Sequence, residues 1–338
     1  MASYRKLDDT GIRFRQLMRR KQGVFGFGVR DAFDASLAEA AGSEVIYAGG
    51  YSIALSKMRP DMGQVNMVEQ AEEVLDIARA VSLPVIADAD DGYGNALNVH
   101  RTVTEFLGRE VYDPRTGHVR RLAGIHLEDQ VFPKRCGHIA GKEVVPRSVM
   151  VKKVELASRL RDEIHPNGVI IARTDVYHSD KPGSMQETVD RGRAYAEAGA
   201  DSVWAEVNTT DRKVAFDFAE QLLKHLPADY PLSFNYSPSL KWAEAPSPLT
   251  FEELAEAGYK FIFVTIAAAH AASYSVYEYA KTLKERGAWA LWFMQQVKRG
   301  HPTESHHQMG RVAMWQDILR QYSPDEEERE KTSEGFKG

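Results

Sequence analysis

Eight short runs of apolar and β-branched residues recur along the chain, and they constrain its fold more than any other feature. They are VFGF (24–27), EVIYAGG (44–50), PVIADAD (84–90), GIHLED (124–129), VIIARTD (169–175), SVWAEV (202–207), PLSFNYS (231–237) and FIFVTI (261–266). Helical patterns such as DAFDASLAEAAG (31–42) and VEQAEEVLDIARAV (68–81) lie between them. Near-continuous apolar strands that alternate with helices indicate a parallel sheet covered by helices. Eight of them predict an α/β fold, a closed (β/α)₈ barrel of the TIM type; a doubly wound open sheet is the alternative.

The predicted barrel occupies about residues 20–270 of the 338-residue chain, and 43% apolar residues are enough for a large core. We interpret 1–338 as a single barrel domain, with additional C-terminal helices over 271–322 and a tail or lid segment over 323–338. The stretch GFGVRDA (26–32) lacks the third glycine of a dinucleotide-binding fingerprint, so it predicts only a turn between a strand and a helix. YDPRTGHVR (112–120) predicts an inserted turn.

Charge and cysteine content exclude several classes of function. The formal net charge is −5 and charges of both signs are mixed along the chain, so no basic surface for nucleic acid is expected. One cysteine cannot form an internal disulfide, the first residues lack an apolar signal core, and no run approaches 18 apolar residues. We expect a soluble, cytoplasmic protein without a nucleic-acid or membrane partner.

Polar residues lie at or near the C-terminal ends of seven of the eight runs. They are Tyr47, Asp88, Asp90, Glu128, Asp129, Arg173, Asp175, Glu206, Asn235, Ser237 and Thr265. In a barrel these ends converge on the face where the loops after the strands build the active site. The simpler interpretation, that polar residues mark where strands reach water, poorly explains several acidic groups beside one arginine.

Carboxylates brought together without counter-charge must protonate or bind a cation. Oxygen ligands with no histidine or cysteine at zinc-like spacing favour Mg²⁺, with Mn²⁺ as a substitute. Such an ion would act as a Lewis acid and a template for a substrate carboxylate.

The only cysteine of the chain, Cys136, lies in FPKRCGHIAGK (132–142), in the loop after the fourth run. Lys134, Arg135 and His138 would favour its thiolate form. An inert, buried cysteine is the alternative, but a loop flanked by glycine and lysine is a poor place for core packing. The sequence therefore favours a reactive thiol.

A second group of residues suits the binding of carboxylates. Arg173 at a strand end can hold a carboxylate in bidentate fashion, and SFNYSPS (233–239) offers Asn235, Ser237 and Ser239 as neutral donors. The same segment also has the composition of a turn, and both interpretations can hold together. The predicted ligand is a small polycarboxylate, bound by metal at one end and by Arg, Asn and Ser at the other.

Six motifs carry a family resemblance and run in family order across most of the chain. They are KRCGH (134–138), GYGNALNV (92–99), HLEDQ (126–130), IARTD (171–175), FNYSPSLKW (234–242) and FIFVTIAAAHAASYSVYEYA (261–280). The chain resembles the isocitrate lyase and phosphoenolpyruvate mutase superfamily, and within it most closely a compact isocitrate lyase. The resemblance implies a Mg²⁺-dependent carbon–carbon lyase of the glyoxylate cycle. Its reaction would be the retro-aldol, Claisen-type cleavage of isocitrate to succinate and glyoxylate.

The resemblance also implies a role for each site residue. Metal binding falls to Asp61, Asp88, Asp90 and Glu128. Cys136 would be the general acid, Tyr47 a candidate base, and Lys134, Arg135 and His138 the groups that tune the thiol. Substrate binding falls to Gly137, Arg173, Glu206, Asn235, Ser237, Ser239 and Thr265, together with Gly49, Gly50 and Tyr51. Most isocitrate lyases have Ser-Gly-Trp where this chain has Gly49-Gly50-Tyr51, so we expect backbone N–H groups to replace a serine hydroxyl.

Alternatives remain open at this stage. The same chemistry could act on 2-methylisocitrate or another substituted malate, or the site could hydrolyse oxaloacetate. A protein of another class, a non-catalytic barrel that binds a metal and a dicarboxylate, would keep the fold without turnover.

The resemblance further implies a homotetramer whose C-terminal helices are exchanged between subunits, and a closing role for KTSEGF in the tail. Composition alone predicts a solvated chain end there. His301, His306 and His307 show no metal-binding spacing and are assigned to a polar surface.

Overall fold

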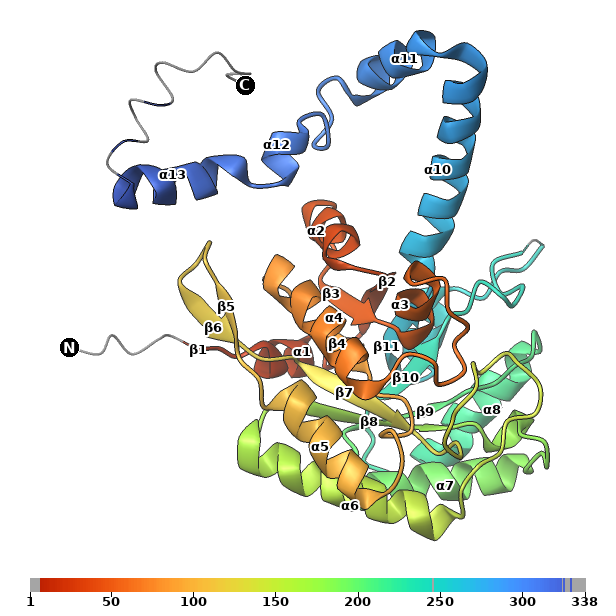
Figure 1. Cartoon of the computed structure of the whole chain (residues 1–338). Helices are drawn as coiled ribbons and strands as arrows, with labels where there is room; N and C mark the ends of the chain where they lie inside the picture. Colours follow the sequence, from red (N-terminus) through yellow and green to blue (C-terminus); the bar gives the residue numbers. More distant parts are fainter. Residues whose placement is uncertain (1–6, 245, 324, 326–328, 330–338) are drawn as a thin grey trace. The chain divides into compact units, whose positions relative to one another are not determined.

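Eight parallel strands close into a barrel in the computed structural model, in the order β10-β11-β2-β3-β4-β7-β8-β9 (Figure 1). Their bounds are β2 Val24–Val29, β3 Val45–Ala48, β4 Val85–Asp88, β7 Gly124–Glu128, β8 Val169–Thr174, β9 Ser202–Ala205, β10 Leu232–Asn235 and β11 Tyr259–Val264. Each of the eight predicted runs overlaps one of these strands; β2 extends two residues past its run, and β11 begins two residues before its run. The predicted TIM-type barrel is confirmed, and the open-sheet alternative is wrong. The structure describes residues 7–244, 246–323, 325 and 329.

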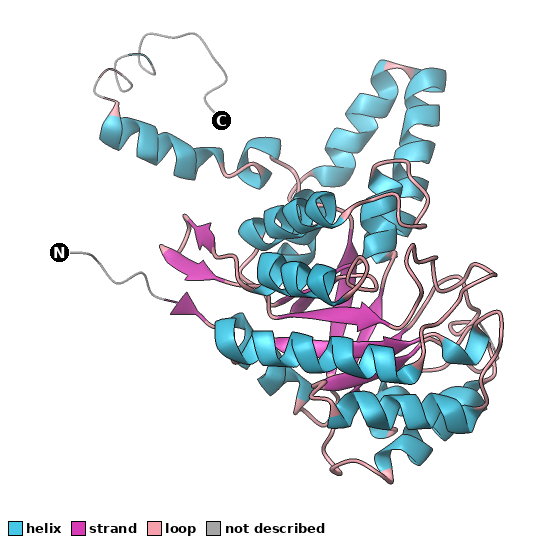
Figure 2. Cartoon of the chain, turned by 60° about the horizontal axis from the view of Figure 1, so that its bottom comes forward, coloured by secondary structure: helices cyan, strands magenta, loops and turns pink. Residues whose placement is uncertain are grey.

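Helices follow the strands and surround the barrel (Figure 2). They are α2 Ala32–Ala40, α3 Gly50–Ser56, α4 Met67–Ala80, α5 Ala96–Leu107, α6 Arg147–Ile164, α7 Met185–Glu197, α8 Arg212–Leu223 and α9 Phe251–Glu256, with a short 3₁₀ turn, η1, at Val176–His178. In α4, the Asn66 side chain and Glu69 form a capping box. Ala71, Val74, Leu75 and Ala78 of α4 are buried at the i, i+3, i+4, i+7 spacing of a core-facing helix. Its apolar stripe therefore sets which face covers the barrel.

The first helix, α1 (Thr10–Met18), closes the N-terminal end of the barrel. Phe14, Leu17 and Met18 pack with residues at the starts of the strands, including Val24 and Val169. The Arg15 guanidinium donates to the carbonyls of residues 167 and 168, directly before β8. Because this end is filled by side chains, the open end of the barrel is the C-terminal one.

A small sheet was missed by the sequence analysis. Strands β1 (Leu7–Asp8), β6 (His118–Arg120) and β5 (Val111–Asp113) form it, and β5 and β6 pair antiparallel where only an inserted turn was predicted. Each strand has two or three residues, too few for a periodic pattern to be visible in the sequence.

The chain divides into two compact units, Met1–His270 and Ala271–Gly338. The C-terminal helices are α10 Ala267–Arg286, α11 Ala288–Lys298, α12 His306–Met309 and α13 Val312–Tyr322, as the predicted additional helices require. His301, His306 and His307 are exposed. The KTSEGF segment lies outside the described residues. Among the residues that are described, no helix combines the length and apolar character needed to cross a membrane.

Candidate active site

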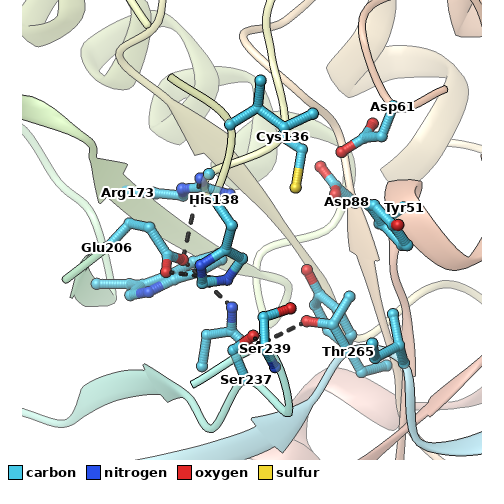
Figure 3. Close-up of a pocket in the computed structure, with 16 residues that line it drawn as sticks. Tyr51, Asp61, Asp88, Cys136, His138, Arg173, Glu206, Ser237, Ser239 and Thr265 are labelled. Atoms are coloured by element: carbon cyan, nitrogen blue, oxygen red, sulfur yellow. Dashed lines mark hydrogen bonds and ion pairs between the residues drawn. The ribbon is translucent and has the colours of Figure 1, made fainter. Parts of the chain in front are cut away.

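A cavity of about 160 Å³ opens at the C-terminal end of the barrel strands (Figure 3). It is lined by Tyr47, Tyr51, Asp61, Asp88, Cys136, Gly137, His138, Ile139, Arg173, Trp204, Glu206, Asn235, Ser237, Ser239, Thr265 and Ile266. Most residues that the sequence predicted for the site therefore share one cavity. The predicted residues that do not line it are Gly49, Gly50, Asp90, Glu128, Lys134 and Arg135.

The Cys136 thiol points into this cavity (Figure 3). Asp61 and Asp88 lie on one side of it, and Arg173 and Glu206 lie on the other. The side chain is 9% exposed. Burial, together with the nearby Asp61 carboxylate, raises the pKa of the thiol to about 11. Lys134 and the His138 backbone do favour the thiolate, as predicted, but desolvation disfavours the charged form more strongly, so the thiol and not the thiolate prevails. A thiol that keeps its proton at neutral pH has the form that a general acid needs.

Lys134 and Arg135 do not surround the thiol as predicted. The buried Lys134 ammonium lies 2.5 Å from Asp61 Oδ1 and 2.8 Å from Asp90 Oδ1. The Arg135 side chain is exposed and donates to the carbonyl of Ala140. Neither side chain lines the cavity, and Lys134 instead joins the acidic residues.

The four predicted metal ligands face Lys134 together. Gly50 N–H donates to Asp88 Oδ2 at 2.9 Å, so this backbone group is held by a carboxylate, and its contact with a substrate stays a prediction. Within the described residues no three His, Cys, Asp or Glu side chains converge as a ready-made metal site. Instead, the Lys134 ammonium bridges two of the four carboxylates.

Negative charge nevertheless exceeds fixed positive charge in this region, as a cation-binding site requires. Six linked carboxylates share three fixed cations: Asp61, Asp88, Asp90, Glu128, Asp175 and Glu206 with Lys134, Lys142 and Arg173. Burial raises the pKa of Asp90 to about 7 and that of Glu128 well above its usual range. The pKa of Asp88 is lowered, because the attraction of His126 and Lys134 outweighs the effect of its burial.

Carboxylate oxygens without a well-aligned hydrogen bond also support a cation site in this region. Asp90 Oδ1 and both carboxylate oxygens of Glu128 accept no well-aligned hydrogen bond from the described residues, although Lys134 and Arg173 lie 2.8 and 3.0 Å away. Oxygen donors with spare negative charge are the ligands that Mg²⁺ and Mn²⁺ prefer. The donor set therefore fits such an ion.

Arg173 at the end of β8 is held among carboxylates. Its guanidinium lies 3.0 Å from Glu128 Oε2, 2.8 Å from Asp175 Oδ2 and 3.9 Å from Glu206 Oε2. It also stacks on the Trp204 ring, 4.4 Å from the centroid. Arg173 reaches the cavity with its orientation fixed by these partners, as a residue that positions a ligand must be.

The opposite wall carries the predicted neutral donors. Asn235 at the end of β10 donates to Glu206 Oε2 at 3.3 Å, and its carbonyl oxygen accepts from the Thr265 hydroxyl at 3.1 Å. The Ser237 hydroxyl accepts from the Ser239 N–H at 3.2 Å, which gives this segment its turn. The segment therefore turns as predicted and its side chains line the cavity, and their binding of a carboxylate stays a prediction.

Tyr47, the candidate base, lies deeper in the barrel. Its hydroxyl is 2.8 Å from His126 Nε2, and that nitrogen is 3.3 Å from Asp88 Oδ1. Burial and the Asp88 charge raise the pKa of the Tyr47 phenol well above its ordinary value. In this state the phenol keeps its proton, so Tyr47 acts as a base only if positive charge bound beside Asp88 lowers its pKa.

His138 belongs to the same cavity. Its Nδ1 lies 3.2 Å from Asn208 Oδ1 and its Nε2 lies 3.6 Å from Glu206 Oε1. The ring is therefore oriented by groups from the loop after β9 rather than by the thiol two residues earlier.

Comparison with known proteins identifies the family. A family model described as phosphoenolpyruvate phosphomutase matches residues 14–284. Isocitrate lyase of Haloferax volcanii is 41% identical over 323 residues, which cover 95% of this chain and 89% of that protein. The chain belongs to the phosphoenolpyruvate mutase/isocitrate lyase superfamily.

Other members of the superfamily are similar along much of the chain. 2-Methylisocitrate lyase of Aeropyrum pernix is 34% identical over 260 residues, 77% of this chain and 75% of that protein. The crystal structure of a 2,3-dimethylmalate lyase superposes with a TM-score of 0.70 at 28% identity and covers 98% of each chain. This chain is accordingly an enzyme of a lyase superfamily.

Five residues in or beside the cavity were missed by the sequence analysis: His126, Ile139, Trp204, Asn208 and Ile266. His126 and Trp204 precede the predicted Glu128 and Glu206 by two residues, and alternate residues of a strand face the same side. That period-2 relation was the available signal for both. Asn208 lies in a loop, where no pattern predicts the direction of a side chain.

Proposed function

We propose that this protein is a Mg²⁺-dependent carbon–carbon lyase that cleaves isocitrate into glyoxylate and succinate. The observation that carries the proposal is the placement of the protonated Cys136 thiol in a cavity between an acidic cluster and Arg173. The identity of 41% with an isocitrate lyase over 95% of the chain supports the choice of substrate.

Asp61, Asp88, Asp90 and Glu128 would hold the metal ion, directly or through water. When bound, Mg²⁺ would supply Lewis-acid stabilisation to the oxygens at the glyoxylate end of the substrate. The surplus of carboxylates over fixed cations around Lys134 supports this assignment.

The remaining chemistry falls to the chain's own residues. In the cleavage, the hydroxyl proton of isocitrate passes to a base, for which Tyr47 is the candidate. The C–C bond then breaks to give the aldehyde of glyoxylate and leaves electron density on a carbon beside a carboxylate. Asn235, Ser237 and Thr265 would hold that carboxylate. The Cys136 thiol would then donate its proton to the carbon to give succinate, and would recover a proton from solvent after product release.

A second substrate is also supported. The relative from Aeropyrum pernix is a 2-methylisocitrate lyase, and Ile139, Trp204 and Ile266 add apolar surface to the cavity. One methyl group in an apolar pocket changes kcat/KM by about 10- to 200-fold. Comparing kcat/KM for isocitrate and 2-methylisocitrate therefore decides between them.

We also propose that the protein is a cytoplasmic homotetramer of the glyoxylate cycle, in which the barrel and its C-terminal helices form one domain. Large apolar side chains left exposed on the C-terminal helices support self-association: Tyr274, Tyr277, Trp292 and Trp315. Light scattering of the purified protein tests the assembly, and a monomer at micromolar concentration would contradict it.

A substrate panel with and without EDTA tests the activity. We expect glyoxylate from isocitrate in the presence of Mg²⁺, none after EDTA, and recovery when Mg²⁺ or Mn²⁺ is restored. Turnover that is unchanged by EDTA, or release of pyruvate but not glyoxylate from the panel, would overturn the proposal as stated. Binding of succinate without turnover of any substrate would favour a non-catalytic barrel.

A further inference from the structure

We propose that Lys142 is a positioning residue for the Cys136 thiol, and that Gln130 holds the same loop from its other side. Neither residue has a part in the chemistry described above. The inference rests on the proposed function only for its kinetic consequence, because the arrangement of the loop is independent of the substrate.

Three successive residues of the cysteine loop each have their backbone held by a different partner. The Gln130 side chain donates to the Arg135 carbonyl and accepts from the Arg135 N–H, both at 2.9 Å. The Cys136 N–H donates to the Asp61 carbonyl at 2.9 Å. The Lys142 ammonium donates to the Gly137 carbonyl at 2.7 Å. The thiol therefore stands on a backbone that is fixed before, at and after its own position.

The Lys142 contact is the one that links this loop to the ligand-binding wall. Its Nζ also donates to Asp175 Oδ1 at 2.8 Å, and Arg173 Nη2 donates to the same carboxylate oxygen at 2.9 Å. Gly137 itself packs so closely on Arg173 that a Cβ at residue 137 would lie 2.4 Å from Nη2. Lys142 thus ties the loop of the proposed acid to the arginine on the cavity wall.

Burial makes the contact strong. Lys142 is 2% exposed, and a buried ammonium needs its hydrogen-bond acceptors in place. If the loop lifted, the ammonium would lose the Gly137 carbonyl and would keep only the shared Asp175 carboxylate. A charged donor of this kind favours the held loop over the released loop by about 10- to 100-fold.

Cys136 provides a direct readout, because it is the only cysteine of the chain and is 9% exposed. The rate of its alkylation by iodoacetamide reports how often the loop releases the thiol. Lys142→Met keeps most of the side-chain volume but removes the donor, and Asp175 remains paired with Arg173. Lys142→Arg keeps a cation and tests rescue.

We expect Lys142→Met to raise the alkylation rate about tenfold or more, to lower kcat for isocitrate by a similar factor, and to change KM by less than threefold. Lys142→Arg should restore part of both rates. Gln130→Met, which loosens the loop without touching any lysine, should raise the alkylation rate in the same direction.

The matched control is Lys260→Met, which removes another lysine whose ammonium binds backbone carbonyls, those of Lys21 and Ala255 at 2.8 and 2.7 Å, at the N-terminal end of the barrel. It should leave Cys136 alkylation within about twofold of the wild-type rate, since a local effect on one loop does not extend to an independent site. Folded Lys142→Met and Gln130→Met variants with wild-type alkylation rates would overturn the inference. Equal acceleration in Lys260→Met would also overturn it, because the effect would then be a general loosening of the fold. A wild-type protein that does not cleave isocitrate would refute the proposed function, yet the alkylation rates would still decide the role of Lys142.

Discussion

At the scale of single residues, the close packing of atoms around Gly49 explains a departure that the sequence pattern alone could not explain. The sequence marked Gly49 as a departure from the usual serine, but the reason is visible only in the structure. A Cβ at residue 49 would lie 2.7 Å from Tyr47 Cε1 and 2.9 Å from Thr265 Cγ2. Gly49 therefore lets the Tyr47 ring and Thr265 take their places beside the cavity.

Gly49→Ala should lower the free energy of unfolding by about 1–3 kcal/mol, because the added methyl group must displace packed atoms. Chemical denaturation measures the loss. Gly310→Ala is the control, since its nearest contact would be an ordinary 3.4 Å, and it should change the free energy by no more than about 0.5 kcal/mol. Equal stabilities for the two variants would show that the space around Gly49 is larger than the structure indicates.

The sequence predicted which residues belong to the site better than it predicted where their side chains point. Asp88, Cys136, Arg173 and Asn235 were found from their positions after strands, because strand ends meet at one face of a barrel. Lys134 and Arg135 were misplaced, because the backbone of a loop and not its sequence sets where each side chain points. The raised pKa of Cys136 was not predicted for the same reason: burial is a property of the folded loop.

At the scale of elements, strong periodic segments were predicted and short ones were not. The eight barrel strands are bounded by polar residues and followed by amphipathic helices, whereas β5 and β6 have three residues each. Ion pairs stabilise that hairpin. The buried Asp113 carboxylate binds Arg120, and it also binds Arg115 at 2.9 Å. These cations lower the pKa of Asp113 to about 2 from an ordinary value of 3.8.

Asp113→Asn should cost about 3 kcal/mol in the free energy of unfolding at pH 7, because it leaves the buried Arg120 without its carboxylate. A lowered folded-state pKa contributes stability that is present above the unfolded pKa and is lost as the pH falls. The difference between wild type and variant should therefore be constant above about pH 5 and shrink between pH 4 and 2. Urea unfolding at several pH values measures it, and a difference that grows on acidification would contradict the assignment.

At the scale of the whole molecule, barrel closure brings together residues more than 200 positions apart, such as Tyr47 and Thr265, in one cavity. The order of strands could be predicted, because parallel strands joined by helices close in sequence order. The balance of charge at the open, C-terminal end of the barrel could not be predicted, since it depends on which loops fold inward. There, carboxylates outnumber fixed cations.

Metal binding should therefore stabilise the folded protein. Mg²⁺ at about 100 times its Kd should add about 2.7 kcal/mol, and each kcal/mol raises the Tm of a large domain by about 2–4 °C. Asp88→Asn should abolish this Mg²⁺-induced rise, whereas the exposed control Asp229→Asn should retain it. Thermal unfolding with and without Mg²⁺ measures both. An undiminished rise in Asp88→Asn would place the metal elsewhere.

The most direct test of the account is the rate of glyoxylate release from isocitrate by wild type and by Cys136→Ser, at neutral pH with Mg²⁺. General acid catalysis contributes about 10²- to 10⁴-fold, and a hydroxyl is a far weaker acid than the thiol it replaces. We expect kcat of Cys136→Ser to fall by that factor, with an unchanged circular dichroism spectrum and Tm. A folded Cys136→Ser variant that retains more than a tenth of the wild-type kcat would contradict the role of Cys136 as the proton donor.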